Sequence, residues 1–241
     1  MLRGFIIALG FLTVFKVRVE PFPELRETGR AAWAFPLVGM VLGGCLVAAY
    51  WALAPRLPLA GVAVLLLVLW VVLTGGLHLD GWADCWDALG AAVSRERRLM
   101  ILKDSRLGTF GALGLLFLLG LKAAVLAQPD LPLFLVFLTP AVGRAVMVVA
   151  PVGVEHTGSG MAAAFVSGLN RKVVLLAAWL GLGPVVFGGW PALVAALAAL
   201  AAGLWFRRLA LARLGMVNGD VLGGICELSE TVFLFVATAR W

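Results

Sequence analysis

The chain has 241 residues, of which 63% are hydrophobic and 13% are charged, and its formal net charge is +6. This composition, with a mean hydropathy of +1.05, excludes an ordinary soluble globular protein and is typical of a membrane protein with several spans. The excess of basic over acidic residues is small, and the orientation of the chain in a membrane explains it better than nucleic-acid binding does. The three cysteines are widely separated, so they indicate neither a disulfide framework nor a zinc site.

Apolar runs follow one another along the chain. The run at 2–17 has no clear cleavage site, so we expect a retained helix and not a signal peptide. The last run, after residue 230, has only eleven residues, which leaves a final span uncertain. We predict one all-α membrane domain, residues 1–241, a polytopic helical bundle with about 6–8 transmembrane helices. The remaining predicted spans are 35–54, 59–74, 111–128, 131–150, 173–188 and 191–206.

Polar segments separate these runs and carry most of the positive charge. Together they contain 14 of the 19 lysines and arginines. If the N-terminus is outside, all four segments face the cytoplasm, as the positive-inside rule requires. We therefore predict a multi-pass protein of the cytoplasmic (inner) membrane, embedded in the lipid bilayer, with its active site on the cytoplasmic face. The sequence leaves homo-oligomerisation open. The polar segments are 16–34, 75–110, 151–172 and 207–230.

The segment 75–109 is the most informative stretch of the chain. It reads GGLHLDGWADCWDALGAAVSRERRLMILKDSRLGT and contains ten charged residues, so it cannot lie in hydrocarbon. In a helix Asp80, Asp84 and Asp87 would fall within a sector of about 60°. Oxygen ligands on one face suit Mg²⁺, which usually takes one or two carboxylates together with substrate phosphates. The alternative is a solvated loop whose acids and bases pair with each other.

Two further groups of residues support a metal-assisted phosphate site. The run from Lys103 to Thr109 combines a lysine, an arginine and two hydroxyls beside a glycine, and this mixture suits phosphate oxygens. The last polar segment repeats the acidic pattern, because acids that enter an apolar run need a metal or a basic partner. The oxygen ligands expected there are Asn218, Asp220, Glu227 and Glu230.

Three other side chains are candidates with equally simple structural explanations. His78 suits a general base or a donor to phosphate, or it caps a helix end. Arg144 lies inside a predicted span, where it is either functional or extends to the lipid headgroups. His156 lies in a Gly-rich connection that suits either a ligand or a flexible loop. Lys122, near the outer end of its span, is expected to extend to the membrane surface.

A resemblance follows from three sequence blocks. GGLHLDGWADCWD at 75–87, KDSRLGTFG at 103–111 and NGDVLGGICELSE at 218–230 resemble, in order, the signature blocks of the cobalamin synthase family. FPLVG at 35–39 and GSGMAAAF at 158–165 are also similar to that family. The resemblance implies a Mg²⁺-dependent transfer that joins adenosylcobinamide-GDP to alpha-ribazole, or to its 5′-phosphate. The products would be adenosylcobalamin, or its 5′-phosphate, and GMP.

Two other functions stay open at this point. A phosphotransferase of the CDP-alcohol type also uses spaced aspartates, but the second aspartate pair of its motif is missing here. A cation transporter would place its acids within the spans, whereas here they lie mainly in the polar segments. The predicted catalytic residues are His78, Lys103, Arg106 and Arg144. The predicted substrate-binding residues are Ser105, Gly108, Thr109, Asn218 and His156. The predicted metal ligands are Asp80, Asp84, Asp87, Asp104, Asp220, Glu227 and Glu230.

Overall fold

The computed structural model describes residues 1–154 and 161–239. Within these residues every regular element is a helix, as the sequence predicts. The elements are α1 (Leu2–Leu12), α2 (Leu25–Ala31), the 3-10 helix η1 (Ala32–Ala34), α3 (Phe35–Leu53), α4 (Leu59–Thr74), α5 (Leu77–Gly90), α6 (Arg95–Ile101), α7 (Thr109–Leu126), α8 (Leu133–Val149), α9 (Met161–Gly168), α10 (Arg171–Leu182), the 3-10 helix η2 (Gly183–Gly188), α11 (Gly189–Arg213) and α12 (Gly219–Ala237).

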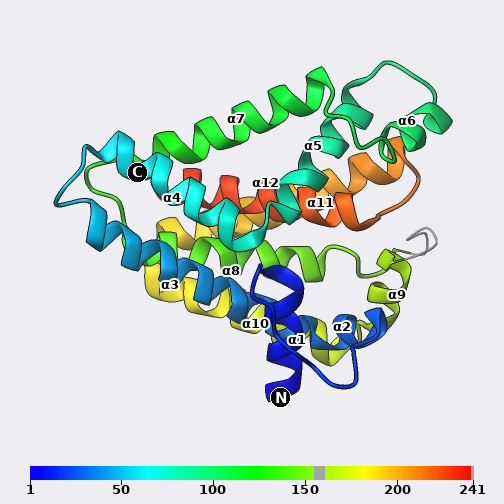
Figure 1. Ribbon diagram of the computed structural model, residues 1–241, viewed down its shortest axis with the longest axis horizontal. Helices are drawn as coiled ribbons and strands as arrows, with labels where there is room; N and C mark the ends of the chain where they lie inside the picture. The colour runs from blue at the N-terminus through cyan, green and yellow to red at the C-terminus, as the bar shows by residue number, and fades with distance from the viewer. Residues whose placement is uncertain (155–160, 240–241) are drawn as a thin grey trace.

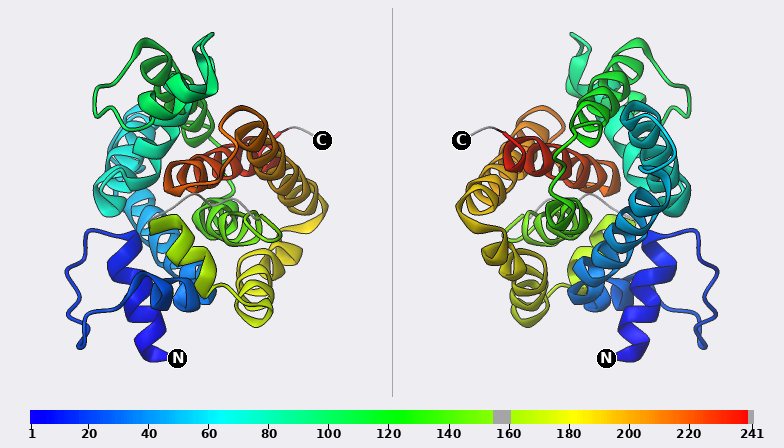
Figure 2. Two further views of the ribbon diagram at one scale, coloured as in Figure 1. Left: turned by 90° about the vertical axis from the view of Figure 1, so that its right-hand side faces the viewer. Right: turned by 90° about the vertical axis from the view of Figure 1, so that its left-hand side faces the viewer.

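The longer helices lie alongside one another with α12 inside the bundle (Figures 1 and 2). α12 packs against α5, α7, α8 and α11, and α3 packs along α8. The short helices α2 and α9 pack against each other close to α1. Because four helices surround α12, most of its residues are buried.

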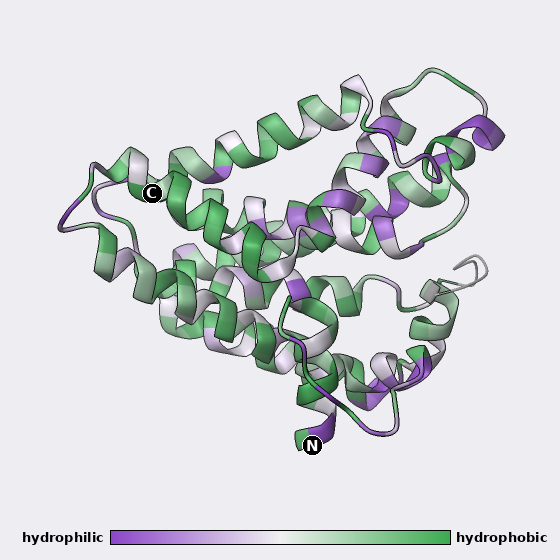
Figure 3. Ribbon diagram, viewed as in Figure 1, coloured by the Kyte–Doolittle hydropathy of each residue, from purple (hydrophilic) through white to green (hydrophobic). Residues whose placement is uncertain are grey.

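Polar residues concentrate at one end of the bundle (Figure 3). This end contains α2, α5, α6 and the first turn of α12, and we call it the polar end. The opposite end carries the short connections from α3 to α4 and from α7 to α8, at residues 54–58 and 127–132 (Figure 1). Segments that are far apart in the sequence therefore meet at the polar end, on one side of the apolar helices.

The protein is an integral membrane protein by the length and composition of its helices. Among the described residues, three helical stretches are long and apolar enough to cross a membrane. A fourth crossing results if α4 and α5, which are bent by 96°, form one broken span. This count is below the predicted 6–8, because α1 and α8 are short, α12 carries acids, and the predicted spans 173–188 and 191–206 fall within one stretch, Arg171–Arg213. The three stretches are Leu25–Leu53, Thr109–Leu126 and Arg171–Arg213.

The predicted first span was too long. α1 ends at Leu12 and has 11 residues, fewer than the roughly 20 that a membrane crossing requires. Beyond α1 the backbone turns away, and the N–H of Val14 donates to the carbonyl of Leu73 at 2.9 Å. This hydrogen bond attaches the end of α1 to the end of α4.

Two glycines separate the apolar helix α4 from the polar helix α5. Gly75 and Gly76 have φ values of 63° and 70°, in the left-handed region that glycine adopts without a steric penalty. Gly75 ends α4 and its N–H donates to the carbonyls of Val71 and Val72, which is a common way to close a helix. The resulting bend directs α5 away from α4, so the charged stretch leaves the apolar zone at this point.

The last polar segment is helical, which corrects the prediction of a polar connection followed by a short apolar run. α12 has 19 residues, enough for about 28 Å of helix. Asn218 caps its start, because its Oδ1 accepts from the N–H of Val221 at 3.0 Å. Residues 218–230 therefore belong largely to a buried helix, and its acids need partners inside the protein.

Candidate active site

Two acidic elements meet at the polar end, namely α5 and the first turn of α12. Asp80 and Asp84 lie one turn apart on α5, so the helical spacing considered for this segment is the one the structure has. Gly81 lets the two helices approach closely, because a Cβ at Gly81 would lie 2.8 Å from the Cα of Asp220. Gly223 has a similar place against His78, at 3.2 Å. The fold therefore brings Asp220 beside Asp80 and Asp84.

No basic side chain neutralises these three aspartates in the part of the chain that the structure describes. The ion pairs found there involve other acids. Burial, followed by the nearby carboxylates of Asp80 and Asp220, raises the pKa of Asp84 to about 6, because both effects disfavour the ionised form. Burial also raises the pKa of Asp220. A bound cation would relieve this repulsion.

The acids do not form a complete metal cage by themselves. Within residues 1–154 and 161–239, no group of three or more His, Cys, Asp or Glu side chains has the arrangement to hold a metal ion. Mg²⁺ sites in phosphoryl-transfer enzymes often have one or two carboxylates and complete their shell with water and substrate phosphates. The arrangement of Asp80, Asp84 and Asp220 suits that kind of incomplete site.

Asp87 has a different environment from Asp80 and Asp84. One carboxylate oxygen accepts the N–H of Gly108 at 2.7 Å, and the other accepts the N–H of Gly111 at 2.8 Å. These two amides belong to the beginning of α7, where helices leave N–H groups unpaired. A side chain at either glycine would overlap the carboxylate. Asp87 thus holds the start of α7 against α5, and both of its oxygens are occupied.

The predicted phosphate-binding loop lies just beyond Asp87. Lys103, Ser105 and Thr109 are exposed. Arg106 is exposed as well, and its guanidinium donates three hydrogen bonds to the Asp104 carboxylate, the shortest at 2.6 Å. These hydrogen bonds lower the pKa of Asp104 to about 2. The loop therefore presents two cations and two hydroxyls to the solvent at the polar end.

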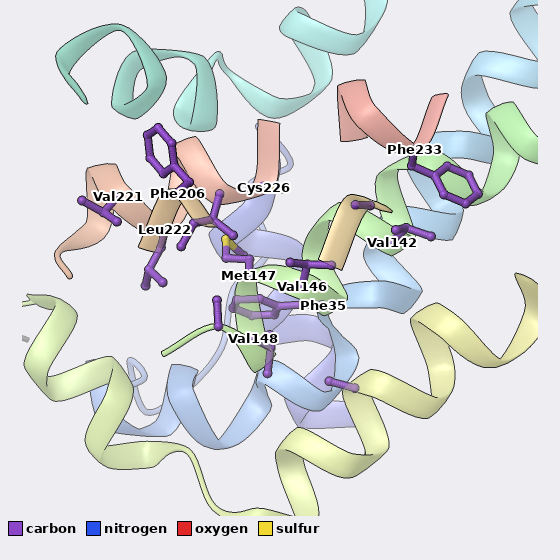
Figure 4. Packing of buried hydrophobic residues seen from close by; sticks show 14 of the residues in the cluster. Phe35, Val142, Val146, Met147, Val148, Phe206, Val221, Leu222, Cys226 and Phe233 are labelled. Atoms are coloured by element: carbon purple, nitrogen blue, oxygen red, sulfur yellow. The ribbon is translucent and has the colours of Figure 1, made fainter. Parts of the chain in front are cut away.

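An apolar cavity of about 280 Å³ adjoins the aspartates. His78, Asp80 and Asp220 contribute its ionisable side chains within the described residues. The Phe35 and Met147 side chains, which also line it, lie close together in the core (Figure 4). A larger hollow of about 640 Å³ lies beside α1 and α2, but it touches none of the aspartates. The smaller cavity is therefore the better candidate for a substrate site.

Glu227 and Glu230 lie deeper in α12 and have basic partners. Lys122 Nζ donates to Glu227 at 2.7 Å and to Glu230 at 2.8 Å. Arg144 donates to the other Glu230 oxygen at 2.6 Å. Lys122 also lies 4.3 Å from the centroid of the Trp70 ring. Two acids and two bases thus form a balanced group inside the bundle, which we call the buried ion network.

The buried ion network corrects the prediction for Lys122 and gives Arg144, Glu227 and Glu230 ion-pair partners inside the protein. Lys122 does not extend to the membrane surface, since it is only 3% exposed and is fully paired. Glu227 is seven residues from Asp220 on one helix, or about 10 Å along its axis. In this structure the Glu227 carboxylate is paired with Lys122 and does not line the cavity beside Asp220. Arg144 and Glu230 pair with each other and do not line the 280 Å³ cavity.

Comparisons with known proteins place the chain in a family. The family model for cobalamin-5-phosphate synthase matches residues 4–238. The chain belongs to this family. It is 41% identical to the adenosylcobinamide-GDP ribazoletransferase of Pseudomonas putida (strain W619), over 98% of both chains. It is 35% identical to the Acinetobacter baumannii enzyme of the same name (strain ATCC 17978), over 96% of this chain and 95% of that one. No solved structure matches the chain.

The structure describes all but one of the predicted site residues, and it adds two buried bases, Arg98 and Lys122, that were not predicted as site residues. His156 lies outside the described residues. Asn218 caps α12 and donates to Asp220 at 2.7 Å, so it positions that carboxylate. Arg98 is buried and donates to the carbonyls of Ala88 and Leu89 at the end of α5. The sequence signal for Lys122 is indirect, since it consists of the need of the α12 acids for a basic partner on another helix.

Proposed function

We propose that this protein is an adenosylcobinamide-GDP ribazoletransferase. A hydroxyl of alpha-ribazole, or of its 5′-phosphate, attacks the phosphoryl group that joins cobinamide to GMP. A P–O bond to ribazole forms and the P–O bond of the phosphoanhydride breaks. GMP leaves with the bonding electron pair, and the hydroxyl proton passes to a base at the site. The products are adenosylcobalamin, or its 5′-phosphate, and GMP.

The match to the family over residues 4–238 carries this proposal. The polar end agrees with it in chemistry, because Asp80 and Asp220, which have no ion pair among the described residues, line an apolar cavity, while Asp87 on the same helix as Asp80 contacts the loop that carries the phosphate-binding groups. A CDP-alcohol phosphotransferase and a cation transporter, which the sequence alone leaves open, belong to other families. The transferase is therefore the function that we propose.

Mg²⁺ fits the residues at the polar end. We propose that one or two of Asp80, Asp84 and Asp220 bind it at a time, with water and substrate phosphates as its other ligands, because these side chains offer only oxygen atoms and have no ion pair among the described residues. When bound, the ion would neutralise the negative charge of the diphosphate during displacement. Asp87 positions α7, and Asp104 holds Arg106 until substrate arrives.

The remaining predicted residues have roles that follow from their positions. Lys103 and Arg106 would bind the phosphate oxygens, with help from the hydroxyls of Ser105 and Thr109. His78 faces the cavity and would accept the hydroxyl proton or donate to a phosphate. Arg144, Glu227 and Glu230 would act through the position of α12 and not by contact with substrate.

We further propose that the polar end faces the cytoplasm at the inner membrane. Its bases agree with the positive-inside rule. The buried ion network would let α12 cross the bilayer together with α4 and α8, because its acids are neutralised within the protein. A reporter fused after Arg98 should then report the cytoplasm, and one at Asp130 the outside. A periplasmic signal after Arg98 in an active protein would overturn this orientation.

The direct test uses purified protein in detergent or liposomes. Adenosylcobinamide-GDP and alpha-ribazole are supplied with Mg²⁺, with excess EDTA, and with EDTA followed by excess Mg²⁺. We expect GMP and adenosylcobalamin to form in equal amounts, to stop with EDTA and to return with Mg²⁺. Absence of both products with Mg²⁺, in protein that unfolds cooperatively, would contradict the proposed function.

A further inference from the structure

The apolar cavity beside the aspartates has an aromatic wall. Phe35 of α3 lies between Phe11 of α1 and Phe165 of α9. The ring centroids are 5.9 Å apart in the first pair and 5.7 Å apart in the second, and the planes are inclined by only 18° and 19°. All three rings line the cavity. Phe35 is fully buried and stacks on both neighbours, so a flat aromatic ligand would meet the ring edges and the exposed part of Phe11.

Another part of the cavity wall is polar and belongs to the proposed reaction site. His78 and Asp80 come from α5, and Asp220 comes from α12. A ligand bound here would therefore have an apolar end among the phenylalanines and a polar end at the aspartates. The cavity is arranged for a molecule with one flat apolar part and one hydroxylated part.

The cavity is too small for the corrin ring and too apolar for the guanine of the substrates. A volume of about 280 Å³ is at the lower end of ligand pockets, which enclose roughly 300–1,000 Å³, so a corrin ring with its side chains does not fit. Guanine carries polar groups around its edge, and burial of these groups without partners is unfavourable. The base of alpha-ribazole is a dimethylbenzimidazole, whose edge is mainly carbon and methyl. It matches both the volume and the apolar wall.

We propose that this cavity is the subsite for alpha-ribazole, with the dimethylbenzimidazole base against Phe11, Phe35 and Phe165 and the ribose directed toward Asp80 and Asp220. This assignment rests on the proposed transferase function. It places the attacking hydroxyl beside the carboxylates and leaves the exposed loop at 103–109 to hold the diphosphate. The two substrates then approach the aspartates from different sides, one from the apolar cavity and the other from the polar surface.

The test compares two phenylalanines of equal exposure. Phe11 and Phe134 are both 42% exposed, and each stacks on another phenylalanine. Phe11 lines the cavity, whereas Phe134 lies on α8 and does not. Since stacking on an aromatic side chain stabilises a bound base, Phe11→Ala should raise the KM for alpha-ribazole about tenfold. Its KM for adenosylcobinamide-GDP should stay within twofold, and Phe134→Ala should change neither constant.

A substrate series tests the same subsite without any change in the protein. Benzimidazole riboside lacks the two methyl groups, and burial of each methyl group in an apolar cavity favours binding. The wild-type enzyme should therefore use it with roughly tenfold lower kcat/KM than alpha-ribazole. Phe165→Leu preserves apolar bulk but removes a flat face, so it should raise the ribazole KM even if Phe11→Ala fails to fold.

The outcomes separate this subsite from the function on which it rests. If wild-type protein forms no cobalamin at all, the transferase proposal fails. If the wild type is active but Phe11→Ala and Phe165→Leu raise the KM for adenosylcobinamide-GDP, the cavity binds that substrate and the subsite is wrong. Unchanged constants in both variants would equally overturn it, and would indicate that the cavity holds a lipid chain or stays empty of substrate.

Discussion

The aspartates at the polar end and the glutamates of the buried ion network have opposite electrostatic environments. Asp80, Asp84 and Asp220 face a cavity or solvent and have no ion pair in the part of the chain that the structure describes. Glu227 and Glu230 are buried and bind Lys122 and Arg144. Acids with internal counterions contribute to the fold, whereas acids without them are available for an external cation.

Helix α12 carries both kinds of acid, so one helix connects the buried ion network to the aspartates at the polar end. The buried ion network fixes α12 against α7 and α8, because Lys122 and Arg144 come from those two helices. The first turn of α12 then holds Asp220 against Gly81. We infer that the network determines where Asp220 lies, although no member of it reaches the cavity.

The largest expected effect is a loss of activity without a loss of stability, from a substitution among the aspartates at the polar end. Asp84→Asn should lower turnover about 10²–10³-fold, since loss of a metal-binding carboxylate removes several kcal/mol of transition-state stabilisation. Its melting temperature in detergent should remain close to that of the wild type. Steady-state GMP release at saturating Mg²⁺ measures the effect, with Asp130→Asn at the opposite end as the control. Activity within a few-fold of wild type would remove Asp84 from the metal site.

Glu230→Gln should act on stability. Loss of one partner from a buried ion pair leaves an uncompensated charge, and the free energy of unfolding should fall by about 3–5 kcal/mol. Denaturant unfolding in micelles measures this change. The matched pair is Lys122→Met alone and Lys122→Met with Glu227→Gln, because the double variant restores charge balance and should be the more stable of the two. A stable Glu230→Gln protein with a raised Mg²⁺ requirement would return Glu230 to the metal ligands.

Asp87→Asn should have an intermediate effect. It weakens two hydrogen bonds from a charged acceptor to the backbone of α7, and such bonds contribute about 1.5–3 kcal/mol each. We expect a lower melting temperature and an unchanged Mg²⁺ concentration for half-maximal activity. A Mg²⁺ titration of the Asp87 and Asp84 variants side by side tests this. An equal shift in both would mean that Asp87 also binds the metal.

Arg106→Lys should have the smallest effect. Lysine keeps the charge but loses the planar fork that binds phosphate with two parallel hydrogen bonds. The KM for adenosylcobinamide-GDP should rise about tenfold, which corresponds to roughly one charge-assisted hydrogen bond. The Mg²⁺ dependence should change little. If it shifts as strongly as in an Asp84→Glu variant, Arg106 supports the acids and does not hold the nucleotide.

Much of the architecture follows directly from the sequence. The span predicted at 59–74 has the same bounds as α4, and those predicted for α3, α7 and α8 differ from the structure by at most two residues at either end. Apolar length and breaks at glycine and proline are local properties, so they can be read from the chain. The helix that aligns Asp80 and Asp84 is local too, because three or four residues make one turn.

The tertiary structure decided which acids share a site. In the sequence, Asp87 and Glu230 resemble Asp84 and Asp220, since all are acids near glycines in polar segments. Only the fold reveals that Asp87 binds the amides of α7 and that Glu230 binds Lys122 and Arg144. Ion pairs join residues by distance in space, and a lysine on one helix and a glutamate on another leave no local pattern. The composition of the chain thus determined a membrane helical protein, and packing around α12 determined which of its charges remain available for chemistry.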